Sequence, residues 1–138
     1  MLMTSAERNI AAAMSFVRAV EQMDGSLMDE FFAKHVEQVE WPNQLKPEGA
    51  RRDLAALKTG IEQARGILRH QSYEIKRQLA DDQSVMLEMV WRGTMATDVP
   101  PLKKDQELCA HCVAVFEFRD GQIVALRNYD CFDPIENN

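Results

Sequence analysis

The feature that most constrains the fold is the change from helical to alternating periodicity near residue 71. From Gln71 to Phe132, apolar side chains recur at every second position, which is typical of half-buried β-strands. Asp120-Gly121 stands between two such runs and strongly favours a β-hairpin. The second half of the chain therefore predicts an antiparallel meander. Its four strands are expected at 72–79, 84–97, 108–118 and 123–132.

The first half of the chain has mainly helical spacing. Apolar residues three or four positions apart predict helices over 4–23, 26–33 and 50–68. One short strand is expected between them, over Val36–Leu45, where Val39 and Trp41 alternate with Glu40. Helices followed by strands indicate an α+β class, with the helices on one face of a curved sheet. We expect residues 1–138 to form one domain.

Composition and charge exclude several classes of function. The chain has 138 residues, enough to bury a core without a disulfide or a metal. Its net charge of −6 gives no support to nucleic-acid binding, and no apolar run reaches the ~20 residues of a membrane span. The N-terminal sequence does not resemble a signal peptide, and the cysteine count is odd. We therefore expect a cytoplasmic protein with reduced thiols.

Three stretches carry a resemblance to a known family: FEFRDGQIVALRNYDCFDPI at 116–135, VEWP at 39–42 and WRGT at 91–94. Together with the order of elements, they resemble the nuclear transport factor 2-like superfamily, in its SnoaL-like and ketosteroid isomerase-related branch. The resemblance implies a cone-shaped fold with three N-terminal helices on a curved, mainly antiparallel sheet, and a pocket inside. This fold hosts isomerases, dehydratases, cyclases, epoxide hydrolases and non-catalytic adaptors, so it does not fix the function.

The alternation, combined with this resemblance, predicts which side chains face the pocket. The set is mostly apolar, as expected for a site that takes a small hydrophobic molecule. A packed core without a cavity is the alternative. Tyr73 is an additional donor if it reaches the pocket. The other expected lining residues are Phe16, Trp41, Asn43, Leu87, Met89, Trp91, Cys112, Ala114, Phe116, Leu126 and Asn128.

The resemblance does not extend to the catalytic residues of the enzymes in this branch. The steroid isomerase base corresponds to Trp41, and the oxyanion-hole residues correspond to Phe16 and Ala114, so that chemistry is not expected. Cyclases and limonene-type epoxide hydrolases use an aspartate in the last strand, where this chain has Asn128. An asparagine can orient a water or a substrate oxygen, but it cannot act as the base.

Asp130 is the remaining candidate for acid–base chemistry. It has the same strand parity as Asn128, and burial beside aromatic walls would raise the pKa of its carboxyl group. The alternative is a structural role, in which Asp130 caps the end of the chain or forms an ion pair with Arg127 or Arg92. Two functions stay open: an isomerase, cyclase, dehydratase or hydrolase acting on a small apolar substrate, and a non-catalytic binding homodimer. An adaptor dimer with a filled pocket is a third hypothesis.

The alternation of side chains along a strand also bears on metal binding and on dimerisation. Cys109 and Cys112 are three positions apart and point to opposite faces of a strand, so no metal and no cofactor are expected. His111 is expected on the outer face, in solvent or at a subunit contact. That face also carries Met86 and Tyr129, and its half-apolar character predicts a homodimer.

Overall fold

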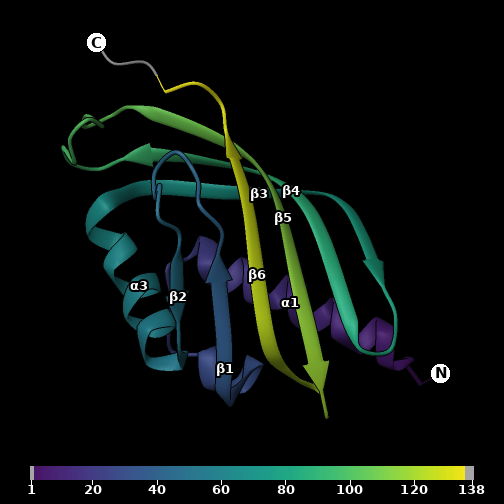
Figure 1. The fold of residues 1–138 in the computed structure, drawn as a ribbon. Helices are drawn as coiled ribbons and strands as arrows, with labels where there is room; N and C mark the ends of the chain where they lie inside the picture. Colours follow the sequence, from purple (N-terminus) through teal and green to yellow (C-terminus); the bar gives the residue numbers. More distant parts are fainter. Residues whose placement is uncertain (1, 136–138) are drawn as a thin grey trace.

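The computed structural model describes residues 2–135, which form three helices and six strands (Figure 1). Within this range, no helix is both long and apolar enough to cross a bilayer. The helices are α1 (Ser5–Glu21), α2 (Met28–Phe31) and α3 (Leu54–Ile67). The strands are β1 (Phe32–Glu40), β2 (Ala50–Arg52), β3 (Leu68–Ala80), β4 (Ser84–Met95), β5 (Glu107–Arg119) and β6 (Gln122–Phe132).

All six strands belong to one sheet in the order β2-β1-β6-β5-β4-β3. Strands β3 to β6 form the expected antiparallel meander, and β2 pairs with β1 in the antiparallel sense. Strand β1 is the exception because it runs parallel to β6. The predicted α+β class with a mainly antiparallel sheet is confirmed.

The first half of the chain differs from the prediction at its element boundaries. Strand β1 begins at Phe32, because this buried side chain already pairs with Ile123 of β6, and α2 is therefore a single turn. The start of the third predicted helix is instead β2, which pairs with the end of β1. Helix α3 then begins after Asp53, whose carboxylate accepts a hydrogen bond from the backbone N–H of Ala56 at 2.9 Å.

The helices pack on the inner face of the sheet. Helix α1 contacts β3 and β4, whereas α3 contacts both β1 and β3. These two strands lie toward opposite edges of the sheet, so the sheet must curl for one helix to reach both. In Figure 1, α1 runs behind the long strands, while α3 lies beside β1 and β2. The inner face is thus covered by two helices at different places.

Helix α1 fills one half of the inner face with a packed core. The Phe16 ring lies edge-to-face with those of Phe32 and Phe116, at centroid distances of 5.2 and 5.8 Å. The alternation correctly orients the strand residues inward, but α1 covers them, so they do not face a pocket. Six residues that were predicted to line the pocket are part of this core: Phe16, Leu87, Met89, Ala114, Phe116 and Leu126.

Candidate active site

A cavity of about 800 Å³ lies between α3 and the other half of the inner face. Its polar groups include Glu40, Arg52, Gln71, Tyr73 and Asp130, whereas most of its wall is apolar. Of the side chains predicted to face the pocket, Tyr73, Trp91 and Cys112 line this cavity together with Asp130. A deep apolar hollow with a few polar groups is the usual form of a small-molecule site.

Small side chains on α3 form one wall of the cavity. Ala56, Gly60 and Ala64 all line it, and the only buried residue of the helix is Leu57. A Cβ atom on Gly60 would meet no other atom within 4 Å. The space on this side of the cavity therefore depends on the small size of the α3 residues.

The loop that follows β4 closes one end of the cavity. Val99 and Leu102 form an isolated β-bridge within it, and both line the cavity. Leu102 is buried against Met95 and Leu108, in a second apolar cluster. Most residues of this loop are exposed, but Leu102 is buried and covers the end of the sheet.

Asp130 lies half-buried on the inner face of β6, where it lines the cavity. Burial raises the pKa of its carboxyl group, a hydrogen bond from the Cys112 thiol lowers it, and the Glu40 charge raises it, with a net increase. The arginines considered as partners are paired elsewhere. Arg127 pairs with Glu117 at 2.7 Å, and Arg92 pairs with Glu74 at 3.5 Å.

Two neutral donors lie close to Asp130. Burial raises the pKa of the Tyr73 phenol, and the nearby thiol of Cys112 and carboxylate of Asp130 raise it further. Burial likewise raises the pKa of the Cys112 thiol, with the Asp130 charge as the second cause. Both groups keep their protons at neutral pH, so each can donate a hydrogen bond into the cavity.

A polar network borders the cavity on the β1 side. The Arg52 guanidinium pairs with Glu40 at 2.9 Å and donates to Gln38 Oε1 at 3.0 Å. Gln38 in turn donates to Asn128 Oδ1 at 2.8 Å, and Asn43 donates to Glu40 Oε2 at 2.9 Å. Asn128 and Asn43 were predicted to line the pocket, but their amides are engaged in this network.

Trp41 lies on the other side of the sheet from its predicted position. It is exposed, and its ring centroid lies 6.2 Å from that of Tyr129. The parallel pairing of β1 with β6 aligns Glu40 with Asn128, which turns the polar side of β1 inward. The prediction assumed that the apolar side faced the pocket, and so it missed Glu40 and Arg52. The alternation of Gln38 and Glu40 with apolar residues was the available signal.

Trp91 is held in place at the cavity wall from three directions. Its Nε1–H donates to Gln71 Oε1 at 2.8 Å, and Gln71 Nε2 donates to the Val20 carbonyl oxygen of α1 at 2.6 Å. The indole also lies edge-to-face with Phe132 at 6.0 Å. A Cβ on Gly93 would approach the indole to 2.5 Å, so only glycine permits this position of the ring. The aromatic wall is therefore preformed.

The fold and this site define a SnoaL-like domain. The SnoaL-like domain family matches residues 13–126, and the chain belongs to this family. Its predicted place in the nuclear transport factor 2-like superfamily is thereby confirmed. No curated protein matches the chain.

Solved structures with the same fold carry the names of different kinds of protein. An LEH-like epoxide hydrolase from M. tuberculosis is 22% identical, with a TM-score of 0.69 over 96% of this chain and 83% of that one. A SnoaL-like polyketide cyclase from Agrobacterium tumefaciens is 9% identical, with a TM-score of 0.67 over 94% and 92%. A protein with a ketosteroid isomerase-like fold from Catenulispora acidiphila, in complex with trimethylamine, is 13% identical, with a TM-score of 0.69 over 86% and 83%. At these identities the likeness shows the fold alone.

Proposed function

We propose that this protein is an acid–base enzyme that acts on a small, largely apolar substrate carrying an oxygen atom. One observation carries the proposal: a carboxylate with a raised pKa, Asp130, lines an apolar cavity whose arginine, Arg52, pairs with Glu40. A carboxylate that is partly buried in an apolar cavity is suited to proton transfer near neutral pH. The reaction is of the isomerase, cyclase, dehydratase or hydrolase type, in line with the names of the structural neighbours.

In this mechanism, ionised Asp130 removes a proton from the substrate or from a water molecule. The Tyr73 hydroxyl donates a hydrogen bond to the substrate oxygen on which negative charge develops. Trp91 and the small residues of α3 bind the apolar body of the substrate. Asn128 has an indirect positioning role, because its contact with Gln38 supports Arg52 beside Glu40. Asp130 finally returns the proton to the product.

A nitrobenzisoxazole is a suitable probe, because its ring opens with a colour change when a base removes its C–H proton. The wild-type protein should open it with saturable kinetics, at a rate that rises as Asp130 ionises. Asp130→Asn should lose about 100-fold or more of this rate, the usual contribution of a general base. Asp120→Asn changes an exposed turn carboxylate and should retain the rate. Equal rates in the wild type and in Asp130→Asn would exclude Asp130 as the base.

The second candidate is a binding protein without turnover. It is favoured by the polar network beside the cavity. Arg52 already pairs with Glu40 and donates a hydrogen bond to Gln38, so these groups are engaged with one another rather than free for catalysis. In a Trp41→Phe background, Trp91 is the remaining tryptophan and reports binding through its fluorescence. Saturable quenching by the probe without ring opening would favour the binding protein. If the probe caused no quenching and no ring opening, both proposed functions would be overturned.

We propose further that the protein is a homodimer that pairs through the outer face of its sheet, in the cytoplasm. Exposed apolar side chains on that face, such as Met86 and Tyr129, support the dimer. The three cysteines are free thiols, which supports a reducing compartment.

A further inference from the structure

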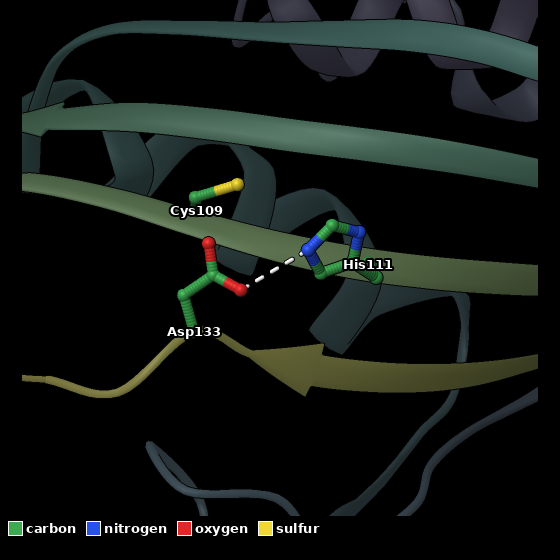
Figure 2. A group of neighbouring side chains, drawn as sticks. All are labelled: Cys109, His111 and Asp133. Atoms are coloured by element: carbon green, nitrogen blue, oxygen red, sulfur yellow. Dashed lines mark hydrogen bonds and ion pairs between the residues drawn. The ribbon is translucent and has the colours of Figure 1, made fainter.

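Three side chains with metal-binding atoms meet on the outer face, away from the cavity. Cys109 and His111 are two positions apart on β5, so both point to the same side of the strand. Asp133 follows β6, and its backbone N–H donates to the Cys109 carbonyl oxygen at 2.9 Å. Figure 2 shows the Asp133 carboxylate between the thiol and the imidazole.

The distances within this cluster suit a single metal ion. The Cys109 sulfur, an imidazole nitrogen of His111 and a carboxylate oxygen of Asp133 all lie within 4.8 Å of one another. His111 Nε2 and Asp133 Oδ1 are 3.0 Å apart. Ligand atoms around a tetrahedral zinc ion, at bonds of about 2.0–2.3 Å, are on the order of 3–4 Å apart. Small side-chain rotations would bring all three atoms into contact with one ion.

We propose that Cys109, His111 and Asp133 form a Zn²⁺-binding site with its fourth position open to water. The donor set identifies the class of metal, because thiolate and imidazole are zinc ligands, whereas Mg²⁺ and Ca²⁺ require oxygen ligands. In a single chain, solvent can reach the ion because His111 and Asp133 are more than half exposed, at 60% and 54%. Cys109 and Asp133 also line a groove of about 790 Å³ at this edge of the sheet.

Zinc binds a cysteine as its thiolate, so binding displaces the proton of the Cys109 thiol to solvent. The Asp133 carboxylate, whose Oδ1 lies 3.0 Å from His111 Nε2, becomes a ligand beside the thiolate and the imidazole.

The sequence predicts no metal site because Cys109 and Cys112 are three positions apart on one strand. Those two side chains do lie on opposite faces, since Cys112 lines the cavity. The third ligand, Asp133, is distant in sequence and reaches Cys109 only through the register of β5 with β6, in which Ala110 faces Phe132. Spacing along one strand could not reveal it.

Zinc and cobalt(II) salts added to the reduced, tag-free protein test the site directly. Calorimetry should give one Zn²⁺ per chain. Cobalt(II) should produce a thiolate charge-transfer band in the near ultraviolet and the visible bands of a tetrahedral site. Binding should release the Cys109 proton into the buffer. No binding in competition with a weak chelator would overturn the proposal.

Single substitutions separate this site from adventitious thiol binding. Cys109→Ser, His111→Ala and Asp133→Asn should each weaken zinc binding by at least about tenfold, since even second-shell losses cost 10–100-fold. Cys131 is an exposed thiol on the same face, opposite His111, so Cys131→Ser is the matched control and should retain both affinity and the charge-transfer band. A charge-transfer band that is absent in Cys131→Ser but present in Cys109→Ser would overturn the assignment.

Circular dichroism of the metal-free variants establishes that they are folded. Cys109→Ala repeats the thiol deletion if Cys109→Ser does not fold. Because every readout is metal binding, the result does not depend on the acid–base function proposed for the cavity.

Discussion

At the scale of single residues, Asp130 links the proposed chemistry to the stability of the fold. Its carboxyl group is half-buried, and this burial raises its pKa in the folded protein above that in the unfolded chain. The folded state therefore binds this proton more tightly, and the free energy of unfolding falls as pH rises between the two pKa values. The wild-type protein should carry a stability cost at neutral pH in exchange for a reactive carboxylate.

Asp130→Asn should remove this cost. We expect the free energy of unfolding of the variant, minus that of the wild type, to increase as pH rises from the unfolded pKa to the raised folded pKa. Above that window the difference should be constant. Urea unfolding at a series of pH values measures it, and the subtraction cancels the other titrating groups. A difference that is flat, or that falls with pH, would contradict the desolvation of Asp130.

At the scale of secondary-structure elements, α3 bounds the cavity with one side, while Leu57 joins the core. Gly60 and Gly66 lie on this helix, and a Cβ on either would meet no atom within 4 Å. Gly60 lines the cavity, whereas Gly66 is absent from its wall. Substitutions at the two glycines therefore form a matched pair, which separates an effect on helix stability from an effect on cavity volume.

Gly60→Leu should fill the cavity and weaken binding of the nitrobenzisoxazole probe by at least about tenfold, or ~1.4 kcal/mol. Gly66→Leu should leave binding unchanged. Both should raise the free energy of unfolding by up to about 1 kcal/mol, because leucine favours helix more than glycine does. Trp91 fluorescence titration and chemical denaturation measure the two effects. Equal losses of binding in both variants would mean that the probe occupies another site.

The element scale also shows what the sequence can predict. The four long strands follow from alternation and from the Asp120-Gly121 turn, which act between neighbours in sequence. Strand β2 has only three residues, and its pairing with β1 spans a loop, so no local pattern marks it. The same long-range pairing decides that Glu40 and Arg52 reach the cavity and that Trp41 does not. The inward-facing residues of the four long strands were predictable, but the inward side of β1, the residues covered by α1 and the strand partner were not.

At the scale of the whole molecule, α1 and α3 cover the inner face and leave the outer face of the sheet open. Leu79, Met86 and Tyr129 are exposed there, at 58%, 44% and 44%. Leu79 and Met86 are direct partners across β3 and β4, so these two exposed apolar side chains are adjacent. A second copy of the chain is the occupant that we propose for this face.

Met86→Glu should convert the homodimer to a monomer, because it would bury a charge in an apolar interface. Leu27→Glu is the matched control, since Leu27 is also exposed but lies just before α2, away from the sheet. It should leave the dimer intact. Sedimentation velocity at micromolar concentration measures both. A wild-type protein that sediments as a monomer would contradict the dimer.

The separation between the α1 core and the α3 wall has an evolutionary consequence. Mutations on α3 can change the shape of one cavity wall, and because only Leu57 of this helix is buried, they carry little risk of unfolding the chain. Mutations in the α1 half are constrained by packing and scarcely alter the cavity. On the α3 side, selection for a new substrate therefore acts on residues that folding does not constrain, and a lineage with this architecture can change its specificity there without first acquiring extra stability.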